Sequence, residues 1–183
     1  MDIRHENNKI KMDWMSRHIP RNSKVLDIGC GQGGDVHKWK RLEADVLGVD
    51  PNLFAIEEAR RRSPGSRFIH GTIEDVPLSF KFDIVCYNFS LHYEDPKNYP
   101  LIASFAPKIV GVVTNPDAIF DDPRIQVRKL SDSCISVYIP DVPYYANGPV
   151  VEPLFDRSKF EEYFDIIEWK PFSIYAKFVG LKK

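Results

Sequence analysis

Val25-Leu-Asp-Ile-Gly-Cys-Gly-Gln-Gly-Gly-Asp35 combines a short apolar run with a glycine-rich segment. The apolar residues 24–29 predict a buried strand that ends in glycine. A helix is expected to follow, from about residue 33 to 41. A strand, a glycine turn and a helix in this order form the first unit of an open α/β sheet, which binds its ligand at the carboxyl ends of its strands. Because glycine lets the backbone approach a ligand closely, we predict ligand contacts at Gly29 and Gly31.

Outward from this stretch, strands and helices alternate along the chain. We predict strands at 44–50, 67–71, 82–88 and 108–114 and helices at 8–18 and 53–62. This alternation favours a mostly parallel, doubly wound α/β sheet with helices on both faces. Further along the chain, the pattern predicts an inserted strand at 135–139, a loop at 141–147, a helix at 157–163, and two terminal strands at 164–172 and 174–181. The two terminal strands suit an antiparallel hairpin on the sheet edge.

Composition limits both the size and the class of the protein. With 183 residues and 43% hydrophobic content, the chain can form one substantial core, so we expect a single domain over 1–183 with an insert around 117–155. A net charge of −1 excludes the overall basic balance of proteins that bind long nucleic acids. Three unpaired-looking cysteines favour a reducing compartment, and no apolar run is long enough for a membrane span. We therefore expect an intracellular protein, cytoplasmic or nuclear.

Two carboxylates predict the chemistry of the ligand. Asp27 lies in the strand just before the glycines, where its charge would repel a pyrophosphate but attract an ammonium or a sulfonium. Asp50 ends the second strand, where an acidic group accepts hydrogen bonds from ribose hydroxyls. Ile73, Glu74 and Asp75 follow the third strand, where an adenine would lie. These positions favour a methionine-type nucleoside cofactor over a dinucleotide.

These residues resemble the class I S-adenosylmethionine-dependent methyltransferases over nearly the whole chain. The resemblance sharpens toward the messenger RNA cap guanine-N7 methyltransferases. Gly31-Gln-Gly-Gly-Asp-Val-His-Lys-Trp39 is similar to the family's G-K-G-G-D-L-x-K-W stretch, which implies that Asp35 helps to hold the methionine end of the cofactor. Asn7-Asn-Lys-Ile-Lys11 resembles the N-N-x-I-K helix, so Lys11 inherits a cofactor-binding role.

Three further matches concern the acceptor. Asn88-Phe-Ser-Leu-His-Tyr93 is similar to the family's Q-F-x-x-H-Y segment, which places His92 and Tyr93 against the cap guanine and Asn88 and Phe89 at the cofactor. Glu152 resembles the family's guanine-binding glutamate. Tyr175 resembles the tyrosine of a terminal S-x-Y strand that faces the cap. An aromatic ring stacked on the base and an acid at its amino edge make a coherent guanine pocket.

The resemblance implies a compact, viral-type cap methyltransferase that uses S-adenosylmethionine and acts on a capped RNA 5′ end. A stimulatory subunit or other capping-enzyme domains are the further partners it implies, with no membrane. Because guanine N7 has no proton to lose, we expect no acid–base catalytic residue, only proximity and orientation, and no metal. The chain departs from the family at Gln32, where many members have lysine, and at Gly71-Thr-Ile73, which lacks the usual aspartate.

Two alternatives remain open. One is a small-molecule N- or O-methyltransferase, because the segments 71–77 and 88–92 also suit generic members of the superfamily. The other is a methyltransferase-fold subunit without turnover, against which the set of Asp27, Gly31 and Asp50 argues. A ribose methyltransferase is disfavoured, because we find no lysine–aspartate–lysine–glutamate set on successive strand ends.

Overall fold

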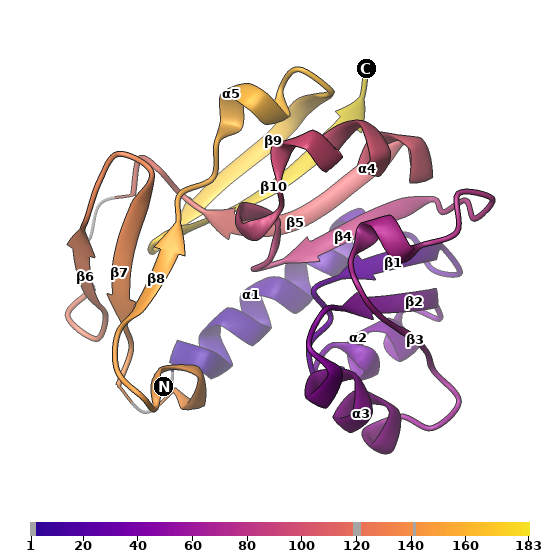
Figure 1. Cartoon of the computed structure of the whole chain (residues 1–183), viewed down its shortest axis with the longest axis horizontal. Coiled ribbons are helices and arrows are strands. Elements are labelled where there is room, and N and C mark those ends of the chain that lie inside the picture. The colour runs from indigo at the N-terminus through magenta and orange to yellow at the C-terminus, as the bar shows by residue number, and fades with distance from the viewer. Residues whose placement is uncertain (1–2, 119–121, 141) are drawn as a thin grey trace.

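The computed structural model describes residues 3–118, 122–140 and 142–183, so residues 119–121 and Asp141 of the predicted insert lie outside it. Its centre is a seven-stranded sheet (Figure 1). In spatial order the strands are β3 (Arg67–His70), β2 (Asp45–Asp50), β1 (Lys24–Ile28), β4 (Ile84–Asn88), β5 (Lys108–Thr114), β10 (Tyr175–Lys182) and β9 (Phe164–Phe172).

Strand directions confirm the predicted doubly wound sheet. The pairs β1–β2, β1–β4, β2–β3 and β4–β5 are all parallel. The final strand β10 runs antiparallel to both β5 and β9, so the terminal hairpin closes one edge of the sheet, as predicted. The order reverses between β1 and β4, and ligands of open α/β sheets bind at such a switch point.

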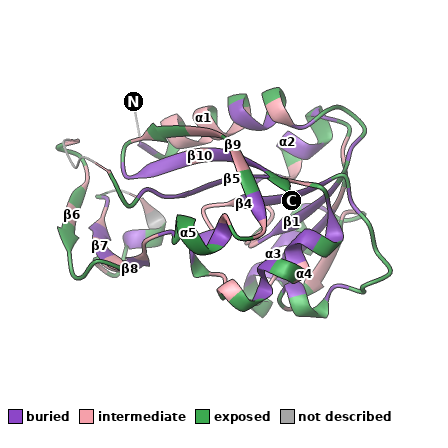
Figure 2. Cartoon of the chain, turned by 90° about the horizontal axis from the view of Figure 1, so that it is seen from above, coloured by how far each residue is buried: buried purple, intermediate pink, exposed green. Residues whose placement is uncertain are grey.

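Two apolar layers cover the two faces of the sheet (Figure 2). Side chains alternate along each strand, so Val25 packs on one face and Leu26 on the other. The first face is covered by α1 (Ile3–His18) and α2 (Val36–Arg41), and the second by α4 (Tyr99–Phe105) and α5 (Arg157–Phe160). The remaining α-helix is α3 (Leu53–Arg62), which contacts β2 and β3. No helix in the described part of the chain is both long and apolar enough to cross a membrane.

A small second sheet stands beside the main one (Figure 1). It consists of β6 (Gln126–Lys129), β7 (Cys134–Tyr138) and β8 (Val150–Pro153), all antiparallel. Its buried side chains Ile135 and Val137 join one cluster with Ile3 of α1, Val112 of β5 and Tyr175 of β10. The N-terminal end of α1 therefore packs between the insert and the main sheet.

Several predicted boundaries were wrong. The first helix begins at Ile3 and not at residue 8, because burial of Ile3 in the insert's cluster extends it. The second begins at Val36 and not near 33, since Gly33 has a left-handed backbone (φ 72°). Strands β6 and β8 and helix α4 went unpredicted; each has seven residues or fewer, and α4 carries a proline in its first turn, a position that helices tolerate.

Candidate functional site

The glycine turn after β1 is shaped by two left-handed glycines. Gly29 and Gly31 have φ angles of 74° and 52°, and a Cβ on Gly29 would lie 2.5 Å from the Cβ of Ser90. Asp50, at the end of β2, accepts the backbone N–H of Gly31 at 2.8 Å and that of Asn52 at 2.9 Å. These two bonds fix the Asp50 carboxylate beside the glycine turn, at the ends of the strands, where it can accept hydrogen bonds from a ligand.

A buried charge cluster lies beside the turn. Asp35 is 9% exposed and its carboxylate binds the ammonium of Lys11 (2.8 Å) and the buried ammonium of Lys38. Asn88 at the end of β4 donates to the same carboxylate (3.1 Å). The two lysines hold the pKa of Asp35 below its usual range against the opposing effect of burial. With one carboxylate and two ammonium groups, this cluster can meet both charges of an amino-acid zwitterion.

Asp27 lies near this cluster, but its side chain is directed toward Trp39 of α2. Its carboxylate accepts the indole N–H of Trp39 at 2.9 Å and lines a separate cavity of about 160 Å³ beneath α2. The side chain shares the α2 face of β1 with Val25, as strand alternation requires. Burial, together with the negative charge of Asp35, raises the pKa of Asp27 to about 7.

Replacing Asp27 by asparagine is expected to stabilise the protein at alkaline pH. The folded carboxyl titrates near pH 7 and an ordinary one at 3.8, so the folded state holds a proton that the unfolded chain has lost in between. This group therefore lowers stability as pH rises through that window. We expect Asp27→Asn to raise the unfolding free energy by about 2–4 kcal/mol at pH 8 and by little at pH 4, as measured by urea denaturation. Equal stabilisation at both pH values would contradict this assignment.

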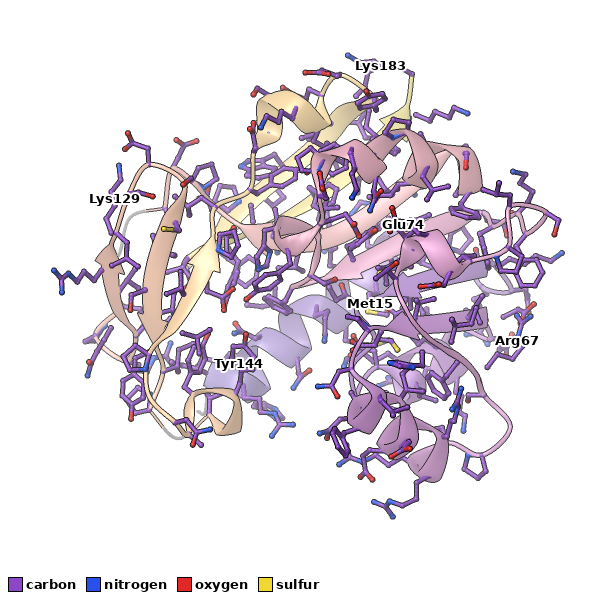
Figure 3. All side chains as sticks on the ribbon, in the orientation of Figure 1. Met15, Arg67, Glu74, Lys129, Tyr144 and Lys183 are labelled. Atoms are coloured by element: carbon purple, nitrogen blue, oxygen red, sulfur yellow. The ribbon has the colours of Figure 1, made fainter. Side chains whose placement is uncertain are left out.

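The segment after β3 presents an apolar side chain to the site. Ile73 is fully buried at the start of the 3₁₀ turn Ile73–Asp75. Asp75 instead accepts the N–H of Thr72 at 2.7 Å, which commits its carboxylate to capping its own turn. Glu74 is exposed (Figure 3). Of the three predicted adenine contacts, the structure places Ile73 alone at the site.

The acceptor-side residues come together from distant parts of the chain. His92, in the 3₁₀ turn Leu91–Tyr93, has its Nε2 3.2 Å from Oε2 of Glu152 on β8, and both side chains are buried. Tyr93 donates its hydroxyl to the same oxygen. Tyr175, the fourth predicted acceptor residue, contacts Phe89 edge to face, with ring centroids 4.7 Å apart. A buried acid framed by aromatic rings can accept hydrogen bonds from a flat, amino-bearing base.

One cleft of about 1100 Å³ is lined both by the predicted cofactor-binding residues and by the predicted acceptor-side residues. Ten predicted site residues line it: Lys11, Gly29, Asp35, Asp50, Ile73, Phe89, His92, Tyr93, Glu152 and Tyr175. The other five lie outside its described lining: Asp27, Gly31, Glu74, Asp75 and Asn88. Gly31 and Asn88 still bind residues of the cleft wall, Asp50 and Asp35.

Sequence reasoning missed several residues of this cleft. The cleft is also lined by Thr72, Tyr144 and Tyr145. The buried Lys38 does not line it but forms an ion pair with Asp35. Tyr144 and Tyr145 lie in the predicted loop 141–147, whose tyrosines were the available signal. Lys38 has a helical spacing of three residues from Asp35, which was a signal for their ion pair.

Comparisons with known proteins agree with this geometry. Residues 25–107 match the family described as methyltransferase domain. The mitochondrial ubiquinone biosynthesis O-methyltransferase of Schizosaccharomyces pombe is 32% identical over 108 residues, which cover 52% of this chain and 39% of that protein. The mRNA cap guanine-N(7) methyltransferase of Eremothecium gossypii is 30% identical over 154 residues, which cover 70% of this chain and 35% of that protein. The chain thus spans less than two fifths of the length of either relative.

A solved structure extends the likeness to the entire fold. The glycopeptide N-methyltransferase MtfA, in complex with S-adenosyl-L-homocysteine, superposes with a TM-score of 0.69 at 14% identity. The superposition covers 100% of this chain and 91% of that one. The sheet order, the glycine turn and this superposition show the fold of the class I methyltransferases, and residues 25–107 match the methyltransferase domain within it.

Proposed function

We propose that this chain transfers a methyl group from S-adenosylmethionine to N7 of the guanine that caps an RNA 5′ end. The observation that carries the proposal is the pairing of His92 with Glu152 at the acceptor end of the cleft, with Tyr93 bound to the same carboxylate. A buried carboxylate there suits the N1–H and amino group of guanine. A hydrophobic acceptor would gain nothing from it, since a buried charge without partners is unfavourable.

The residues at the other end of the cleft fit S-adenosylmethionine as the cofactor. Asp50 offers an anchored carboxylate to the ribose hydroxyls, and Gly29 leaves space where a side chain would collide with Ser90. Lys11 and Asp35 can hold the carboxylate and the ammonium of the methionine end. When bound, the cofactor supplies an electrophilic methyl group on a positively charged sulfur.

The chain's own part in the reaction is to orient the base. The lone pair of guanine N7 would form the new nitrogen–carbon bond, and S-adenosylmethionine would supply the methyl group and keep the electron pair of its sulfur–carbon bond. N7 carries no proton, so no side chain has to remove one. Glu152 and the aromatic rings fix the plane of the base, and the fixed geometry supplies the rate enhancement through proximity and orientation. Glu152 also stabilises the positive charge that the guanine acquires.

The share of this chain that each relative matches supports capped RNA as the acceptor. The ubiquinone biosynthesis relative matches 52% of this chain, about the extent of the general methyltransferase domain. The Eremothecium cap methyltransferase matches 70% of this chain, so its match extends beyond the 83 residues of the general domain at 25–107.

Methyl transfer to capped RNA tests the proposal. We expect the purified chain to transfer labelled methyl from S-adenosylmethionine to GpppA- or GpppG-capped RNA and to release N7-methylguanosine on digestion. The rival small-molecule N- or O-methyltransferase, supported by the ubiquinone biosynthesis and malonyl-[acyl-carrier protein] O-methyltransferase relatives, predicts transfer to a small metabolite and not to capped RNA. A methyltransferase-fold subunit without turnover predicts neither product.

A further inference from the structure

A chain of hydrogen bonds runs from the mouth of the cleft to its buried acid. The hydroxyl of Tyr144 lies 3.3 Å from the hydroxyl of Tyr93, which in turn bonds to Oε2 of Glu152. Nε2 of His92 reaches the same Oε2 at 3.2 Å. Two side chains of the 3₁₀ turn Leu91–Tyr93 thus bond to one carboxylate oxygen of Glu152, and Tyr144 is linked to that oxygen through Tyr93.

The direction of each bond follows from the number of protons. A carboxylate only accepts, so Tyr93 spends its single hydroxyl proton on Glu152. Burial and the bond to Glu152 raise the pKa of Tyr93 above its usual value, so this proton stays on the hydroxyl. The oxygen of Tyr93 is then left to accept, and Tyr144 must be the donor in their contact. By the same rule, His92 carries its proton on Nε2.

This arrangement fixes Glu152 by one oxygen and leaves the other for a ligand. None of the hydrogen bonds among the described residues ends on Oε1 of Glu152, while Oε2 receives two donors. Glu152 lines the cleft, and its side chain is only 5% exposed. A guanine edge would therefore meet a carboxylate whose orientation is set by Tyr93, and the orientation of Tyr93 is set by Tyr144.

Tyr144 is placed to act at the mouth of the cleft. It lies in the 3₁₀ turn Pro143–Tyr145 between β7 and β8 (Figure 3). Its side chain is 60% exposed. Its neighbour Tyr145 is buried and contacts the Tyr144 ring edge to face at 5.0 Å. Tyr145 belongs to the apolar cluster under the small sheet, so the turn is anchored while the Tyr144 hydroxyl reaches toward the acceptor side.

We propose that Tyr144 is a positioning residue for the acceptor: its hydroxyl, acting through Tyr93, sets the orientation in which Glu152 meets the guanine. This inference rests on the proposed function and deepens it. The insert thereby contributes both the acid that contacts the base, on β8, and the residue that orients this acid, on the preceding turn.

A double-mutant cycle on the two hydroxyls tests the inference. Tyr144→Phe removes one hydrogen bond between neutral groups, so we expect the KM for GpppG-capped RNA to rise about threefold to tenfold. The kcat and the dissociation constant for S-adenosylmethionine should stay within about twofold. Tyr93→Phe should raise the KM further. If Tyr144 acts through Tyr93, the double variant should match Tyr93→Phe alone.

Tyr163→Phe is the matched control, because Tyr163 precedes β9 at the opposite end of the main sheet and should leave the KM unchanged. An unchanged KM in Tyr144→Phe, or additive losses in the double variant, would overturn the inference while the wild-type activity upholds the proposed function. If the wild type forms no N7-methylguanosine, the proposed function fails and this inference fails with it.

Discussion

Glu152→Ala is expected to lower kcat/KM for capped RNA by about 100-fold to 1000-fold, because hydrogen bonds to a buried charged acceptor are worth several kcal/mol together. In the proposed function the carboxylate of Glu152 binds the base and not the cofactor. Asp35 and Asp50 hold their own partners and do not bond to Glu152. The dissociation constant for S-adenosylmethionine, measured by calorimetry, should therefore change by less than about threefold.

His92→Ala and Glu152→Gln serve as companions to this variant. His92→Ala removes one donor to Oε2, so cap use should weaken with cofactor binding largely intact. Glu152→Gln keeps the shape of the side chain but replaces one accepting oxygen by a donor that faces a donor, so it should lose nearly as much as alanine. Equal loss of cap use and cofactor binding in these variants would contradict the division of the cleft into two ends. Thermal unfolding separates that result from simple loss of the fold.

The main sheet was predictable because its strands carry their own signal. Residues 25–28 and 84–87 are buried on both faces of the sheet, so apart from Asp27 they form apolar runs bounded by turns. The hairpin of β9 and β10 was predictable because two strand-like stretches follow each other directly at the end of the chain. By contrast, β6 and β8 have four residues each and depend on pairing with β7, which a local pattern does not reveal.

The direction of Asp27 shows where residue-based reasoning about the site stopped. Its position before the glycines predicted a carboxylate that attracts the cationic end of the cofactor, but alternation along β1 sends its side chain to the face of Val25 and Trp39. The alternation of side chains along the strand was readable from the sequence, but the position of Trp39, which donates its indole N–H to this carboxylate, was not. Tyr144 is the opposite case: its loop has no periodicity, and its contact with Tyr93 joins residues 51 positions apart.

Asp35→Ala should cause the largest loss of stability, about 3–5 kcal/mol, because it leaves the buried ammonium of Lys38 without its carboxylate. The side chain of Lys38 is only 3% exposed, and Lys11 adds a second positive charge nearby. Asp35 also accepts a hydrogen bond from Asn88, so its replacement removes the contacts that join α1, α2 and β4 here. For a chain of this size we expect the melting temperature to fall by about 10 °C or more.

The double variant Asp35→Ala/Lys38→Met separates stability from binding. Methionine keeps the length and apolar stem of Lys38 and removes the uncompensated charge, so most of the lost stability should return. Affinity for S-adenosylmethionine should not return, because the carboxylate that would meet its ammonium is still absent. A double variant as unstable as Asp35→Ala would show that Asp35 stabilises the fold through Lys11 and Asn88 and not through the buried pair. Recovery of cofactor affinity along with stability would show that Asp35 only supports the fold.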